Sequence, residues 1–231
     1  MSIDGDKITE IFCMADDFCR VYDRFINANG LAPVRDRSKR KYHRDGKLSD
    51  AEVITIMILF HLSGYKCLKH FYLDEVCKNR ADLFPKTVSY NRFIELERKV
   101  AIPFILFVKR CCMGACTGIS FVDSTALRVC RNQRIRLHKV FKGLAQRGQC
   151  SMGWFYGFKL HLICSEKGEI LNFMLTPGNV DDREPLRNKS FIEQIFGKLV
   201  GDKGYISKDL FSRLFVDGIQ LVTKLKSNMK G

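Results

Sequence analysis

The chain has 231 residues, a formal net charge of +14 at pH 7, and hydrophobic residues at 46% of its positions. This length and apolar content predict a globular protein of one large or two smaller domains with ample core, and they exclude a disordered chain. The positive charge indicates a polyanionic partner. Nucleic acid fits better than a membrane, because the longest apolar runs are far below the roughly 18 residues of a membrane-spanning helix.

The ten cysteines raise the question of disulfides or zinc. None of them forms a C-x-x-C pair, and the acidic N-terminus that starts at Met1 is not a signal peptide. We therefore predict reduced thiols and a cytoplasmic protein. Four residues could in principle bind zinc: His61, Cys67, His70 and Cys77. Their spacing matches no standard zinc finger, so packing in the core is the favoured interpretation.

The first half of the chain, residues 1–113, is expected to be helical. Residues 7–28 carry apolar side chains at three-to-four spacing, which predicts an amphipathic helix. A capping box from Ser49 to Glu52 opens a buried helix, and residues 66–78 predict a further one. The next helix runs toward Pro103, which is expected to kink it or split it in two.

Two parts of this helical half are candidates for DNA contact. Residues 33–47 contain seven Lys and Arg against two Asp, and we predict a basic, mobile connector. A helix expected to begin at Thr87 follows the preceding one after a short turn, with Ser89, Asn91 and Arg92 on its first turn. A helix-turn-helix-like unit presents such residues to a major groove. In the alternative, a plain helical bundle, they are only surface and capping residues.

After Gly114 the chain becomes strand-rich, so residues 114–231 are expected to form a second domain. The predicted elements are a strand at 119–122, a hairpin of strands at 156–164 and 170–175, a helix at 182–196, a strand before Asp202, a helix at 207–216 and a strand at 219–225. This order predicts an α/β fold with flanking helices around the mixed sheet of the ribonuclease-H-like type. In that sheet the first and fourth strands are neighbours.

An aspartate follows each of two apolar runs in this domain. Asp123 follows the run that begins at Ile119, and Asp202 follows the run that begins at Lys198. Because side chains at the carboxyl ends of neighbouring strands converge on one crevice, we expect the two carboxylates to lie side by side. Two such carboxylates repel each other, and a divalent cation such as Mg²⁺ relieves the repulsion. The alternative is that each Asp is an ordinary turn residue.

The segment from Ser124 to Ser165 contains no Asp or Glu. A run of positive charge is often only a solvent-exposed surface. Beside a candidate metal site, however, it favours the binding of a phosphodiester substrate against the metal. We therefore predict that its basic residues contact DNA: Arg128, Arg131, Arg134, Arg136, Lys139, Lys142, Arg147 and Lys159.

Four motifs, taken in order, resemble the catalytic core of DDE transposases from bacterial insertion sequences. They are Phe121-Val-Asp-Ser-Thr, Gly153-Trp-Phe-Tyr-Gly-Phe-Lys-Leu-His, Thr176-Pro-Gly-Asn-Val-Asp-Asp and Gly201-Asp-Lys-Gly-Tyr. The resemblance implies that Asp123 and Asp202 are two of three acids that hold two Mg²⁺ or Mn²⁺ ions. It also implies cleavage and strand transfer of double-stranded DNA at element ends and at a target, by a homo-oligomer.

The third acid of that family is a Glu on a helix after the last strand, whereas no Glu follows Glu193 here. We therefore expect a chain truncated before that helix, with an incomplete two-metal site and little or no activity. Loss of the helix is also expected to expose apolar residues such as Leu221 or Leu225. Two alternatives are a catalytically dead DNA-binding remnant or regulator of the same element, and a simple nuclease of the same fold.

Overall fold

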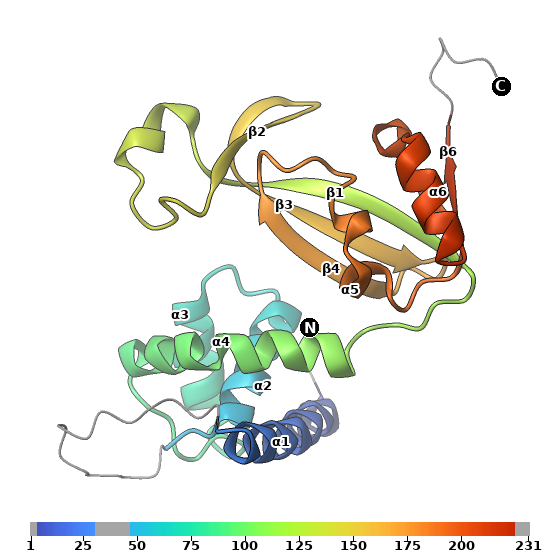
Figure 1. Ribbon diagram of the computed structural model, residues 1–231. Coiled ribbons are helices and arrows are strands. Elements are labelled where there is room, and N and C mark those ends of the chain that lie inside the picture. The colour runs from blue at the N-terminus through green and yellow to red at the C-terminus, as the bar shows by residue number, and fades with distance from the viewer. Residues whose placement is uncertain (1–3, 31–46, 225–231) are drawn as a thin grey trace. The chain divides into compact units, whose positions relative to one another are not determined.

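The computed structural model describes residues 4–30 and 47–224 (Figure 1). The chain divides into two compact units, Met1–Cys112 and Met113–Gly231, and this division falls one residue before the expected boundary. The basic connector expected at 33–47 lies outside the described residues except for Lys47, so the structure leaves it as a prediction.

The first unit is helical and is built around buried side chains such as Ile54, Phe71 and Phe93. Its elements are α1 (Gly5–Ala28), α2 (Asp50–Ser63), α3 (Leu68–His70), the π-helix η1 (Phe71–Asn79) and α4 (Tyr90–Cys111). The helix expected at 66–78 is thus a short α-helix followed by a π-helix. Pro103 is buried within α4 and does not split it, because the helix runs without a break from Tyr90 to Cys111.

Among the described residues no single helix is long and apolar enough to cross a membrane. Only Asp50–Ser63 and Leu68–Asn79, taken together, have the required length and composition, and they are bent by 117° relative to each other.

The capping box at the start of α2 is present as predicted. The Ser49 hydroxyl accepts a hydrogen bond from the Glu52 amide at 3.1 Å, and the Glu52 carboxylate accepts one from the Ser49 amide at 2.6 Å. We expect Ser49→Ala to lower the free energy of unfolding by about 1 kcal/mol, because a backbone donor loses its partner. Urea unfolding measures this, with Ser49→Asp as the control that keeps an accepting oxygen. Equal stability of the two variants would contradict the assignment.

The second unit contains a mixed sheet of six strands (Figure 1). They are β1 (Ile119–Cys130), β2 (Gln146–Cys150), β3 (Gly153–Ser165), β4 (Ile170–Pro177), β5 (Gly197–Gly201) and β6 (Ile219–Thr223). β1 lies between β3, to which it is antiparallel, and β5, to which it is parallel. β5 also pairs in parallel with β6. β2 and β4 pair antiparallel with successive parts of β3. The predicted adjacency of the first and fourth strands is confirmed, because β5 lies next to β1. β5 is the fourth of the predicted strands, since β2 was not among them.

One face of this sheet is covered by α5 (Lys189–Ile192) and α6 (Lys208–Val216), which lie on the same side in Figure 1. Alternate residues of the strands, among them Val122, Ile163 and Leu199, point into this core. The residues between them lie on the other face and stay partly open, so that Phe121 is 45% and Leu175 is 53% exposed.

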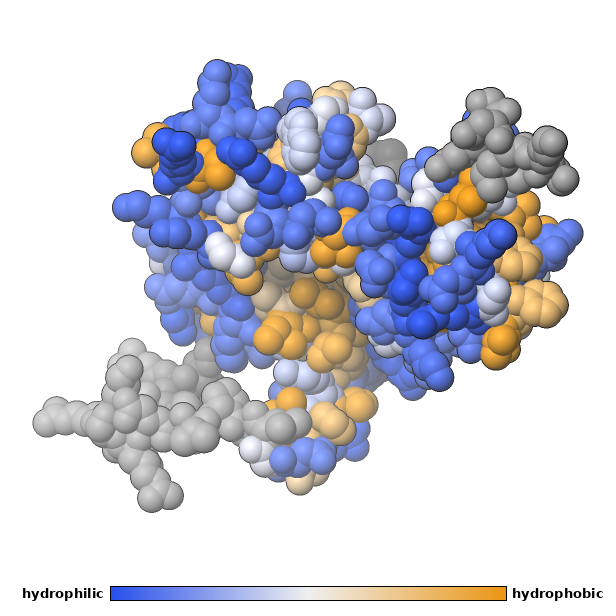
Figure 2. All heavy atoms as spheres, turned by 45° about the horizontal axis from the view of Figure 1, so that its top comes forward, coloured by the Kyte–Doolittle hydropathy of each residue, from blue (hydrophilic) through white to orange (hydrophobic). Residues whose placement is uncertain are grey.

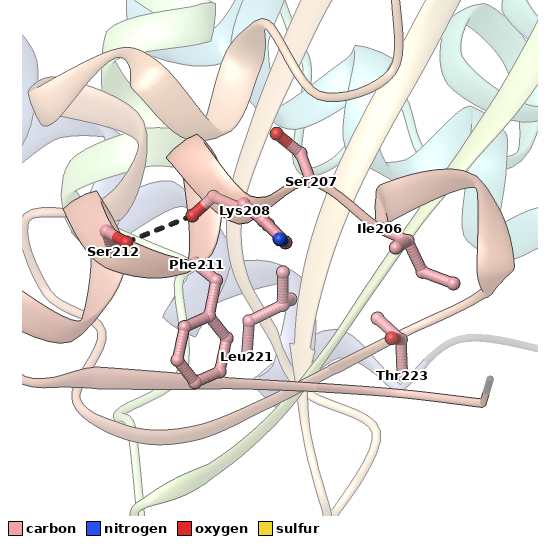
Figure 3. A pocket seen from close by; sticks show the side chains of 7 residues that line it. All are labelled: Ile206, Ser207, Lys208, Phe211, Ser212, Leu221 and Thr223. Carbon is pink, nitrogen blue, oxygen red and sulfur yellow. Dashed lines mark hydrogen bonds between the residues drawn. The ribbon is translucent and has the colours of Figure 1, made fainter. Parts of the chain in front are cut away.

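Leu221 does not behave as expected. It is 7% exposed because it lies on the covered face of β6. Figure 3 shows it below α6, beside Phe211 and facing a shallow pocket of about 350 Å³ that also includes Ile206 and Thr223. Leu225 lies outside the described residues.

Three elements differ from expectation. The helix expected at 182–196 is reduced to a 3-10 turn, η3 (Pro185–Arg187), and α5, because Asn188 caps a new helix start by accepting from the Ser190 amide. β1 is longer than expected because it pairs with β3 as far as Cys130. β2 was not anticipated, since its residues lack apolar alternation.

Candidate active site

The two candidate carboxylates are both exposed and each is held by a backbone amide. Asp123 lies within β1 and not at its end, which corrects the expected position, and its Oδ1 accepts from the Ser124 amide at 2.7 Å. Asp202 directly follows β5, and its Oδ1 accepts from the Gly204 amide at 2.7 Å at the start of a 3-10 turn, η4 (Lys203–Tyr205). Hydrogen bonds of this kind limit the rotation of both carboxylates.

The strand register brings these two residues to the same level of the sheet. β1 and β5 pair in parallel, with Phe121 opposite Val200. Extending this register by two residues sets Asp202 opposite Asp123. Both carboxylates also act on one buried group, because the charges of Asp123 and Asp202 each help to raise the pKa of Tyr205. The two carboxylates therefore act on the same buried tyrosine, Asp123 from within β1 and Asp202 from the end of β5.

A third carboxylate, Asp182, contacts Ser124, the residue that follows Asp123 in β1. Its Oδ1 accepts a hydrogen bond from the Ser124 hydroxyl at 2.9 Å and forms an ion pair with the Lys159 ammonium at 2.9 Å. The same ammonium donates to the Val180 carbonyl at 2.9 Å. The Lys159 side chain is 11% exposed, so the ion pair is shielded from solvent on the lysine side.

Two further polar side chains are buried next to this ion pair. His161 bonds through Nε2 to the Thr176 hydroxyl at 2.9 Å, while its Nδ1 has no hydrogen-bond partner among the described residues. Burial lowers the pKa of His161, which keeps the ring neutral near pH 7. The Tyr205 hydroxyl also has no hydrogen-bond partner within the described part of the chain. Burial, followed by the charge of Asp182, raises the pKa of Tyr205, so the phenol is protonated and available as a donor.

The structure changes the expected role of Lys159. A phosphate contact needs an exposed ammonium, whereas this one is buried and paired with Asp182. The strand alternation already carried this signal, because Lys159 and His161 fall on the face of β3 opposite to Phe158 and Leu160. Asp182 was expected only as a possible substitute acid, together with Asp209. Sequence reasoning missed the roles of Ser124 and Tyr205, although each lies within one of the four motifs.

The other seven basic residues of the predicted contact surface are all exposed: Arg128, Arg131, Arg134, Arg136, Lys139, Lys142 and Arg147. They lie along residues 128–147, here called the basic arm, which connects the end of β1 to β2 through a 3-10 helix, η2 (Asn132–Leu137). Figure 2 shows this region, at its upper left, as largely hydrophilic with a few hydrophobic residues between.

Aromatic contacts hold the basic arm against β3. The ring of Phe141 meets Phe158 edge-on at 5.5 Å between centroids, and His138 lies 6.1 Å from Tyr156. The arm is therefore a positioned charged surface and not only a solvated loop.

The three N-terminal candidates lie at the start of α4. Ser89 is its N-cap residue and makes no capping hydrogen bond, Asn91 is exposed, and Arg92 pairs with Glu95. η1 ends at Asn79 and α4 begins at Tyr90, so ten residues separate them. A helix-turn-helix has a turn of about three or four residues, and this geometry therefore differs from the expected one. DNA contact by Ser89, Asn91 and Arg92 stays a prediction.

The oxygen donors at Asp123 and Asp202 suit a hard divalent cation. Mg²⁺ keeps several waters and is commonly bound through one or two carboxylates together with substrate phosphates. Among residues 4–30 and 47–224, no group of three or more His, Cys, Asp or Glu side chains lies close enough to hold a metal ion. The ten cysteines are all free thiols. Binding of a divalent ion by Asp123 and Asp202 therefore stays a prediction.

Comparison with known proteins gives one family match. A family model described as a transposase DDE domain matches residues 113–231. No curated protein sequence matches significantly.

Solved structures give weaker likenesses. A piggyBac transposase synaptic complex with hairpin DNA has 16% identity and a TM-score of 0.45, over 96% of this chain and 49% of that one. A Mos1 transposase paired-end complex with the left transposon end has 10% identity and a TM-score of 0.28, over 87% and 66%. A Mos1 mariner paired-end complex with Mn has 8% identity and a TM-score of 0.29, over 96% and 78%. The chain spans about half the length of the piggyBac chain.

Proposed function

Because the chain belongs to the transposase DDE domain family, we propose that it is the DNA transposase of a bacterial insertion sequence, which cuts element ends and joins them to target DNA. The observation that carries the proposal is that Asp123 lies in β1 and Asp202 directly follows β5, the neighbouring parallel strand, inside the region that the family model matches.

In this proposal Asp123 and Asp202 hold the divalent ions, Mg²⁺ or Mn²⁺. When bound, such ions stabilise the negative charge on the attacking and leaving oxygens of the phosphodiester. The Ser124 and Gly204 amides fix the two carboxylates. The basic arm binds backbone phosphates, which orients the DNA without reading its sequence.

We extend the proposal to the assembly and its location. Joining two element ends to one target requires two sets of acids, so the active form is proposed to be a homo-oligomer on double-stranded DNA. A cytoplasmic location accords with the free cysteines.

A DNA-binding regulator that does not cut is the second candidate. It is favoured by the finding that, within the described residues, no third acidic side chain completes a metal-binding group with the two aspartates. With only two carboxylates, more of the coordination shell must be water, and the ion is held less tightly.

A nicking assay separates the two candidates. Labelled DNA duplexes with the sequences that flank the coding sequence on either side are incubated with the protein and Mg²⁺ or Mn²⁺. The controls are a reaction with chelator and a reaction with the Asp123→Asn variant. Metal-dependent nicking that the substitution removes supports the enzyme, whereas DNA binding without nicking supports the regulator. Transfer of the labelled 3′ end into a second duplex distinguishes a transposase from a simple nuclease.

A further inference from the structure

The ion pair between Lys159 and Asp182 has no part in the proposed function so far. We propose that these two residues position the Asp123 carboxylate through Ser124, so that Lys159 acts within the active site and not as a phosphate contact. This inference rests on the proposed metal-dependent function and assigns to it two positioning residues.

The contacts form a continuous path from Lys159 to Asp123. The Lys159 ammonium is 2.9 Å from Asp182 Oδ1, which also accepts from the Ser124 hydroxyl at 2.9 Å. The Ser124 amide then donates to Asp123 Oδ1 at 2.7 Å. Ser124 is thus anchored by its side chain and orients Asp123 by its backbone, so a shift of the anchor reaches the carboxylate directly.

Burial makes this path rigid. The Lys159 side chain is 11% exposed, and its ammonium is shared between Asp182 and the Val180 carbonyl. A buried ammonium is stable only when paired and hydrogen-bonded, so Asp182 and the backbone at Val180 are held where the lysine requires them. The ion pair therefore fixes the segment after β4 against β1.

Tyr205 links the same path to the second acid. It belongs to η4, whose N-cap residue is Asp202, and it is 2% exposed. Its buried hydroxyl lacks a hydrogen-bond partner among the described residues and is influenced by the charges of Asp182, Asp123 and Asp202. The Ser124 side chain also acts on this hydroxyl and lowers its pKa, so Tyr205 lies beside the residue that links Asp182 to Asp123.

The other acids near the end of the chain do not share this arrangement. Asp209 pairs with Arg187 at 3.0 Å and with Arg213 at 3.3 Å, and its side chain is 54% exposed on α6. It is accordingly the matched control for Asp182. Lys167, exposed in the turn between β3 and β4, is the matched control for Lys159.

The test compares Ser124→Ala, Lys159→Gln and Asp182→Asn with the parent chain in two binding measurements. Calorimetry with Mn²⁺ alone measures metal affinity, and a salt titration with a DNA duplex measures phosphate contact. We expect Ser124→Ala and Lys159→Gln to weaken Mn²⁺ binding about tenfold, as loss of a group that orients a metal ligand typically does. Asp182→Asn should weaken it to a similar extent, because it removes the charge partner of the buried Lys159 ammonium even though its amide oxygen can still accept from Ser124.

DNA affinity and its salt dependence are expected to stay at the parent values in all three variants. Asp209→Asn and Lys167→Gln should leave Mn²⁺ binding unchanged. Thermal unfolding confirms that each variant is folded at the temperature of measurement, and Lys159→Arg, which keeps the charge, should restore part of the metal affinity if the pair is what matters.

Three results would overturn the inference. If Lys159→Gln lowers DNA affinity and leaves Mn²⁺ binding intact, Lys159 is a phosphate contact after all. If Asp182→Asn is the most damaging variant and Ser124→Ala is harmless, Asp182 is itself a metal ligand. If the parent binds Mn²⁺ and all three variants equal it, only the positioning role is refuted. A parent chain that binds no Mn²⁺ removes the proposed metal-dependent function as well.

Discussion

Replacing Asp123 by asparagine is expected to reduce metal-dependent DNA cleavage by at least about a hundredfold, the usual loss when one charge-stabilising group is removed from an active site. The substitution keeps the size and one accepting oxygen of the side chain, so the Ser124 amide retains its partner. The variant lacks the negative charge that is proposed to hold the divalent ion together with Asp202.

The same variant should bind Mn²⁺ more weakly than the parent chain, as isothermal titration measures directly and without DNA. Asp202→Asn should behave in the same way, since Asp202 directly follows β5, the parallel neighbour of the strand that carries Asp123. Asp209→Asn, which removes an exposed carboxylate on α6, is the control and should not differ from the parent. Equal Mn²⁺ affinity of the parent and Asp123→Asn would mean that Asp123 is only a structural residue.

Binding to duplex DNA should depend steeply on salt. With about six phosphates neutralised, the affinity is expected to fall by roughly three orders of magnitude between about 50 and 200 mM salt, because each neutralised phosphate releases a counterion. The net charge of +14 and the seven exposed cations of the basic arm are the physical basis of this expectation. Salt-independent binding would remove the electrostatic account.

The basic arm can be tested separately from the rest of the positive charge. A triple variant, Arg131→Gln, Arg134→Gln and Arg136→Gln, should lower the slope of log affinity against log salt by about three, near one unit for each phosphate that is no longer neutralised. Replacing three exposed lysines outside the arm, Lys167, Lys189 and Lys208, by glutamine is the matched control. Equal slopes in both triple variants would show that the arm has no special place in DNA binding.

Local sequence patterns were enough to predict those elements that depend mainly on interactions between residues close together in the sequence. The capping box set the start of α2, and the alternation of β3 separated its two faces before the sheet was known. The order of strands was enough to place β1 beside β5, because few sheet topologies accommodate that order. A joint metal site at Asp123 and Asp202 stays a prediction. Patterns were misleading where a helix cap or a strand partner decides the length of an element, as in α5 and β1.

Only the tertiary structure decided what each charge near Asp123 does. In the sequence, Lys159 is one more cation in a basic run. In the structure it is a buried ion-pair partner, because its position in β3 directs it toward Asp182 in the segment after β4. Arg128 and Lys142 carry the same charge and stay in solvent on the basic arm. Composition counts such residues alike, whereas burial separates them, since a charge without solvent must find its partner inside the fold.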